Sequence, residues 1–91
     1  MHIRTYATLR DLLGVSALDL ALPGQADVRY VLDQVVAAHP TLAGKLWDAA
    51  GNWSGFVTVL LNGRSVEYLQ GLATPVRDDD NISLFPPVGG G

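Results

Sequence analysis

The stretch that decides the fold is DVRYVLDQVVAAHP, residues 27–40. Its apolar side chains recur at intervals of three and four residues, as they do along one face of an α-helix; they are Val28, Val31, Leu32, Val35 and Val36. Asp27 can cap the start of this helix, because its side-chain oxygen can accept from the first backbone N–H groups. Pro40 disfavours helical backbone at the preceding residue and predicts the end. The sequence therefore predicts one amphipathic helix with a single face to bury.

Two strands are predicted before this helix. Residues 2–7, HIRTYA, alternate in polarity, and residues 17–23, ALDLALP, alternate up to a turn at Pro23-Gly24. Between them, residues 8–14, TLRDLLG, indicate one or two helical turns that end at Gly14.

The clearest signal after the helix is a β-hairpin over residues 56–69, FVTVLLNGRSVEYL. Its centre, Asn62-Gly63, suits the two positive φ angles of a type I′ turn between β-rich runs. The other predictions are a short helix over 40–48, a loop over 49–55, an irregular polar segment over 70–81 and a final strand, ISLF, over 82–85.

The order strand, strand, helix, strand, strand, strand predicts an α+β fold, a ubiquitin-like β-grasp roll. We expect a mixed sheet of four to five strands covered by one main helix, with the final strand at its centre. The length predicts a single domain over residues 1–91, in which 86–91 form a flexible, extended C-terminal tail. A ferredoxin-like sandwich is the main alternative, but it needs a second long helix.

Composition excludes several classes of function. The net charge is −3, and the six Lys and Arg residues are scattered, so nucleic-acid binding is not expected. No apolar run approaches the roughly 20 residues that span a bilayer, and no signal peptide is evident, which predicts a cytoplasmic protein without a membrane contact. No metal site is predicted, because Asp78, Asp79 and Asp80 are consecutive and calcium loops space their ligands.

The last seven residues, FPPVGGG, raise a separate question. Pro86 and Pro87 favour an extended path, and glycine, with no Cβ, makes the thinnest peptide. Extended, this segment reaches about 20 Å from the last strand. Such an end can enter a narrow channel on another protein and present its carboxylate there. A carboxylate must be activated before it can act as an acyl donor, and the chain has no phosphate-binding loop of its own.

The chain resembles the MoaD/ThiS family of ubiquitin-like sulfur carriers, and most of all MoaD, the small subunit of molybdopterin synthase. The segments that carry the resemblance are YATLRDLLG at 6–14, LNGR at 61–64, LATPVRDDDNISLFPPV at 72–88 and the closing Gly90-Gly91. Many members have Ala, Thr or Ser where this chain has Gly89, a change that adds flexibility without a steric bar.

The resemblance implies a function for the chain terminus. Gly91 would be adenylated by an E1-like enzyme of the MoeB type and converted to a thiocarboxylate, with Gly90 beside it in the partner's channel. The implied partner-binding residues are Phe85, Pro86, Pro87, Val88 and Gly89. The chain would bind no cofactor itself, since the activating partner uses ATP and Mg.

The resemblance also implies where the sulfur goes. As a non-catalytic subunit, the chain would join a large subunit of the MoaE type and donate sulfur for molybdopterin, in molybdenum cofactor biosynthesis. The alternatives are a carrier for cysteine, thiamine or tRNA thiolation, or a ubiquitin-like protein modifier.

Overall fold

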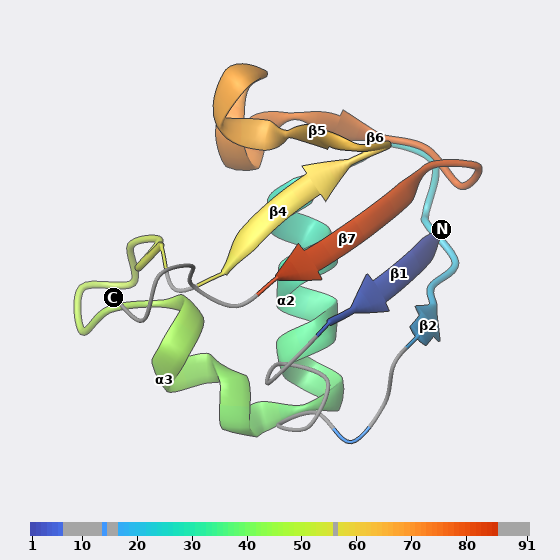
Figure 1. The fold of residues 1–91 in the computed structure, drawn as a ribbon. Helices are drawn as coiled ribbons and strands as arrows, with labels where there is room; N and C mark the ends of the chain where they lie inside the picture. The colour runs from blue at the N-terminus through green and yellow to red at the C-terminus, as the bar shows by residue number, and fades with distance from the viewer. Residues whose placement is uncertain (7–13, 15–16, 56, 86–91) are drawn as a thin grey trace.

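A computed structural model describes residues 1–6, 14, 17–55 and 57–85 (Figure 1). The described helices and strands are, in chain order, β1 (His2–Thr5), β2 (Ala17–Asp19), β3 (Ala26–Asp27), α2 (Val28–Ala38), η1 (Pro40–Leu42), α3 (Ala43–Leu46), β4 (Thr58–Leu61), β5 (Arg64–Ser65), η2 (Val66–Tyr68), η3 (Gly71–Ala73), β6 (Pro75–Val76) and β7 (Asn81–Phe85). The predicted helical turns over 8–14 and the tail over 86–91 lie outside the described residues, apart from Gly14.

Five of these strands form a mixed sheet in the order β2-β1-β7-β4-β5. β7 lies at its centre, parallel to β1 and antiparallel to β4 (Figure 1). The last strand is therefore hydrogen-bonded on both sides, and its two neighbours fix the position at which it ends. The central position of the final strand was predicted from the element order, and it is confirmed.

Helix α2 covers one face of this sheet (Figure 1). Its buried face consists of the predicted residues Val28, Val31, Leu32 and Val35, and it meets Ile3, Val59, Ile82 and Leu84 from the three central strands. Burial of a side chain of this size contributes about 1.5–3 kcal/mol, so this layer supplies most of the driving force for folding. The α+β roll with one main helix is confirmed.

Both ends of α2 match the predicted signals. Asp27 Oδ1 accepts a hydrogen bond from Tyr30 N at 2.8 Å, and Thr74 O accepts one from Val28 N at 3.0 Å. At the other end, His39 is the C-cap and Pro40 begins the following 3₁₀ turn. The capping by Thr74 brings the segment before β7 onto the start of the helix.

The hairpin turn is confirmed at Asn62-Gly63, where φ is 51° and 84°. The predicted second strand, however, was too long. β5 spans only two residues, and a 3₁₀ turn follows, because Ser65 Oγ accepts from Glu67 N and Val66 turns into the core. A hydroxyl that bonds the local backbone competes with the strand pairing that alternation predicts.

The segment over 70–81, predicted to be irregular, contains a strand that the sequence did not reveal. β6 pairs with β3, with Ala26 opposite Val76 and Asp27 opposite Pro75. A two-residue strand is too short to show a period of two, which is why neither strand was predicted.

No helix in the described part of the chain combines the length and the apolar character that crossing a membrane would require.

Candidate functional site

Phe85 ends β7 and begins the predicted partner-binding segment. It lies opposite Thr58 of β4, and on the other side Tyr6 N donates to Leu84 O at 3.2 Å. The remaining predicted site residues, Pro86, Pro87, Val88, Gly89, Gly90 and Gly91, lie outside the described residues, so their roles stay predictions.

The ring of Phe85 stacks on the ring of Tyr6. The ring centroids are 4.4 Å apart, and the planes are inclined by 6°. Both residues are half-buried, so each ring shields one face of the other from water. Aromatic pairs contribute about 0.5–1.5 kcal/mol beyond their buried area. The stack joins the end of β7 to the end of β1, just where the described part of the chain stops.

This aromatic pair lies on the face of the sheet opposite α2, called here the outer face. Side chains alternate along a strand, and Leu84, next to Phe85, is buried at 1% exposure against the helix. One row further along the sheet, Arg4, Ser83 and Leu60 are register partners on this same face. The outer face thus presents aromatic, aliphatic and cationic groups next to the point from which residues 86–91 continue.

Sequence analysis missed Tyr6 as a site residue. The alternation in residues 2–7 placed it on the face opposite Ile3, which is correct. Its contact with Phe85, however, depends on the parallel register of β1 and β7, in which Thr5 lies opposite Leu84. That register joins residues about eighty positions apart and leaves no local trace in the sequence.

Two aspartates of the DDD run, Asp78 and Asp80, have structural roles. Asp78 Oδ1 accepts from Leu22 N at 2.9 Å, and Asp80 Oδ2 accepts from Arg77 N at 2.8 Å. The first bond ties the turn before β7 to the chain between β2 and β3, and the second closes the turn itself. In the described ranges no group of three or more His, Asp or Glu side chains is arranged to hold a metal ion.

The two histidines also have structural positions. His2 Nδ1 lies 2.5 Å from Asp19 Oδ1, between paired residues of β1 and β2. His39 caps the end of α2.

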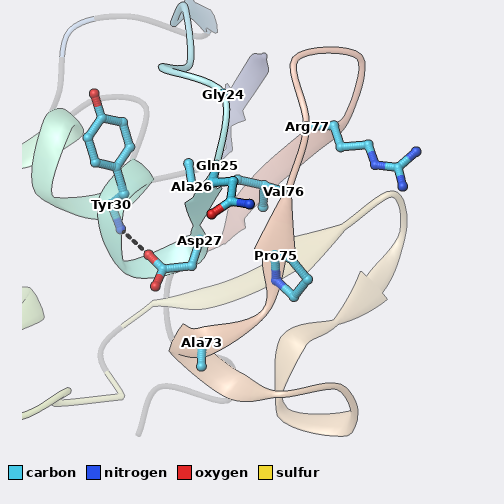
Figure 2. Close-up of a pocket in the computed structure, with 9 residues that line it drawn as sticks. All are labelled: Gly24, Gln25, Ala26, Asp27, Tyr30, Ala73, Pro75, Val76 and Arg77. Carbon is cyan, nitrogen blue, oxygen red and sulfur yellow. Dashed lines mark hydrogen bonds between the residues drawn. The ribbon is translucent and has the colours of Figure 1, made fainter.

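An open hollow of about 570 Å³ lies between β3, β6 and the start of α2 (Figure 2). Its carboxylate, Asp27, is engaged as the helix cap, and Arg77 extends away from the other labelled side chains (Figure 2). Strand β6, whose two residues line the hollow, lies near the beginning of β7 rather than near its end (Figure 1). The hollow is therefore not part of the site formed by Phe85 and Tyr6.

The amino-acid sequence matches a family model over almost the whole chain. The model of the ThiS family matches residues 3–91. The chain belongs to the ThiS family of ubiquitin-like sulfur carriers. Its similarity to Small archaeal modifier protein 3 of Haloferax volcanii is 38% identity over 91 residues, covering 100% of this chain and 98% of the relative.

The chain is also similar to a curated sulfur carrier and to a solved structure of a modifier protein. Sulfur carrier protein CysO of Mycobacterium tuberculosis is 30% identical over 63 residues, which cover 67% of this chain and 68% of CysO. The crystal structure of SAMP1 from Haloferax volcanii superposes with a TM-score of 0.86 at 31% identity, covering 100% of this chain and 98% of SAMP1. The family that the sequence motifs indicated, and the β-grasp fold that goes with it, are thus confirmed.

Proposed function

We propose that the carboxyl group of Gly91 is charged by an E1-like adenylyltransferase and then carries sulfur. In the first step the carboxylate attacks the α-phosphorus of ATP, with Mg, on the activating enzyme, and pyrophosphate leaves. In the second step a hydrosulfide-equivalent donor attacks the carbonyl carbon, the bond to AMP breaks, and the thiocarboxylate forms. Gly90 and Gly91 are small enough to pass along the enzyme's channel.

The observation that carries this proposal is the family match, which extends through residue 91. The fold is consistent with it, because β7 is held by strands on both sides and ends at the Tyr6–Phe85 stack. The sheet therefore fixes the position of Phe85, the residue after which residues 86–91 follow. A partner that docks on the sheet would meet this segment at a fixed starting point. Pre-organisation of this sort lowers the entropy lost on binding.

The outer face is the surface that we assign to the activating partner. It carries Tyr6, Phe85 and Leu60 next to the start of the tail, while α2 covers the other face. Interfaces commonly use aromatic side chains as anchors. A partner on this face would contact both the sheet and Phe85 before the tail enters its channel.

Intact-mass measurement tests the proposal. The purified chain is incubated with a cognate E1-like enzyme, Mg-ATP and a sulfur donor. The expected product is heavier by the difference between one sulfur and one oxygen atom. A chain ended at Val88 should stay unchanged, and a Gly89→Ala variant should react as the wild type does, because many family members have a small side chain there. An unchanged mass of the wild-type chain with several such enzymes would overturn the proposal.

A narrower proposal concerns the acceptor of the sulfur. Residues 84–88, LFPPV, together with the terminal glycines, resemble MoaD, and we infer a role as the small subunit of molybdopterin synthase with a large subunit of the MoaE type. The thiocarboxylated chain, mixed with that large subunit and the cyclic pterin phosphate precursor, should yield molybdopterin. Thiocarboxylate that persists in this mixture would exclude the role and leave the carrier function standing.

A second candidate function is protein modification. It is favoured by the 38% identity to a small archaeal modifier protein over the full chain. In that case the activated Gly91 would be attached to amines of target proteins. Higher-mass conjugates that disappear when the chain is ended at Val88 would support this function.

A further inference from the structure

The turn between β4 and β5 contains a peptide bond of a chemically labile kind. The chain has three asparagines, Asn52, Asn62 and Asn81, and of these only Asn62 precedes a glycine. The backbone nitrogen that follows an asparagine can attack the side-chain amide carbon, and glycine hinders this attack least because it has no Cβ. Asn62 and Gly63 are both exposed. The sequence thus favours one asparagine for this reaction, and solvent reaches it.

The side-chain amide of Asn62 is bound through both of its polar atoms. Its Oδ1 accepts a hydrogen bond from Asn81 N at 2.9 Å, and its Nδ2 donates one to Asp80 Oδ1 at 2.9 Å. The backbone N–H of Asn62 also donates to Asn81 O at 2.8 Å. The amide plane must turn to receive Gly63 N, and hydrogen bonds that lie near this plane oppose the rotation. The reaction therefore requires the side-chain bonds of Asn62 to open.

Opening of this turn does not require the core to unfold. β5, which follows the turn, spans two residues and lies at the edge of the sheet. It pairs with β4 through Leu60–Ser65 and Leu61–Arg64. The hydrogen bonds of the Asn62 side chain are exposed to solvent. Segments with exposed hydrogen bonds and few buried contacts open locally while the rest of the fold stays intact. The reaction can thus proceed in the folded chain, at a rate proportional to the fraction of open turns.

We propose that Asn62 is a site of spontaneous deamidation, and that its hydrogen bonds to Asp80 and Asn81 set the rate. Gly63 N loses its proton to solvent and attacks Cγ of Asn62. The bond from Gly63 N to Cγ forms, the bond from Cγ to Nδ2 breaks, and the leaving group takes a proton from solvent and departs as ammonia. Water then opens the cyclic imide at one of its two carbonyl groups, which gives aspartate or isoaspartate.

The product places a second carboxylate at the beginning of β7. Asp80 Oδ1 lies 2.9 Å from the nitrogen of Asn62 that an oxygen would replace. A donor becomes an acceptor, and two like charges face each other at hydrogen-bond distance. The isoaspartate form also adds a carbon atom to the backbone of the turn, which disturbs the pairing of β4 with β5. Deamidation therefore weakens the attachment of the turn to β7, in a chain whose net charge is already −3.

Mass measurement on the purified chain, kept in neutral buffer, tests the site. The product is heavier than the starting chain by the difference between a hydroxyl and an amino group. Trypsin releases residues 46–64, which contain Asn52 and Asn62, and fragment spectra show which of the two has changed. We expect the change at Asn62. Asn52 in the same peptide and Asn81 in the peptide of residues 78–91 serve as internal controls and should stay intact.

Two aspartate variants measure how far the hydrogen bond restrains the reaction. Asp80→Ala removes the acceptor of Asn62 Nδ2, whereas Asp79→Ala removes an equal charge from an exposed neighbour. Asp80→Ala should deamidate about two- to tenfold faster than the wild type, a factor that corresponds to the loss of one hydrogen bond. Asp79→Ala should react at the wild-type rate. Circular dichroism shows whether Asp80→Ala is folded during the incubation.

Asn62→Asp carries the charge of the product and tests its effect on the fold. It should unfold at a lower urea concentration than the wild type, and this difference should shrink when Asp80 is replaced by alanine.

Three results would overturn the proposal. One is deamidation of Asn52 or Asn81 as fast as that of Asn62. Another is an equal rate in the wild type and in folded Asp80→Ala, since the hydrogen bond would then restrain nothing. The third is a folded chain of unchanged mass under conditions in which the urea-unfolded chain deamidates at Asn62, because the turn would then not open.

Discussion

The two ends of β7 are held in different ways. At its beginning, Asn81 exchanges backbone and side-chain hydrogen bonds with Asn62, and Asp80 accepts from Asn62 Nδ2 at 2.9 Å. At its end, Phe85 pairs with β4 and stacks on Tyr6, on a face that α2 does not cover. We infer that the contacts at the beginning of β7 stabilise the fold, whereas those at its end form the candidate functional site. Substitutions along β7 and its neighbours test this division.

The largest loss of stability is expected in the buried part of β7. Ile82 is 0% exposed and packs in the layer beneath α2. Ile82→Ala should lower the free energy of unfolding by about 2–5 kcal/mol, through lost burial and the cavity that remains. Urea unfolding followed by circular dichroism measures this. A loss no larger than that of Phe85→Ala would contradict the division between the two ends.

The second-largest loss of stability is expected in the polar network at the beginning of β7. Asn62→Ala removes the side-chain bonds to Asn81 and Asp80. It also places alanine at a φ of 51°, a left-handed conformation that asparagine adopts more readily than alanine. We expect a loss of about 1–3 kcal/mol.

Asn62→Gly is the matched control for this network, because glycine tolerates the positive φ but lacks the amide. The difference between the two variants measures the backbone strain, and the loss in Asn62→Gly measures the hydrogen bonds. A fully stable Asn62→Gly variant would show that the network does not hold this end.

The aromatic stack should contribute less to stability and more to activation. Tyr6→Leu, Phe85→Leu and the double variant form a cycle whose coupling free energy we expect to be about 0.5–1.5 kcal/mol. The rate of adenylate formation, measured by pyrophosphate release, should fall in all three variants. Expressed as a free energy, this loss of rate should exceed the loss of stability. Unchanged rates in all three variants would show that the Tyr6–Phe85 stack has no part in activation.

The smallest change in stability is expected on the outer face. Leu60 is half-buried there, as the register partner of Ser83. Leu60→Asp should cost about 1 kcal/mol or less. It should raise the KM of the activating enzyme for this chain, since a charge would enter an apolar contact. Glu67→Lys, an exposed change on η2, serves as the control and should leave the KM unchanged.

The local signals were strong where one element carried its own pattern. The apolar stripe of α2, its cap at Asp27 and the turn at Asn62-Gly63 all appear in the structure as the sequence predicted. Prediction from the sequence failed for elements that are too short to show a pattern. β3 and β6 have two residues each, and β5 ends early because Ser65 bonds its own backbone.

The sequence by itself determined the helix, the central place of the last strand and the family, because periodicity, terminal motifs and the order of the elements can all be read along the chain. Only the tertiary structure decided which side chains meet. The pairing of Tyr6 with Phe85 and the enclosure of the Met1 amine by Leu20 and Asp78 both join distant segments. Such contacts depend on strand register and on the closure of long loops, and no window of the sequence contains both partners.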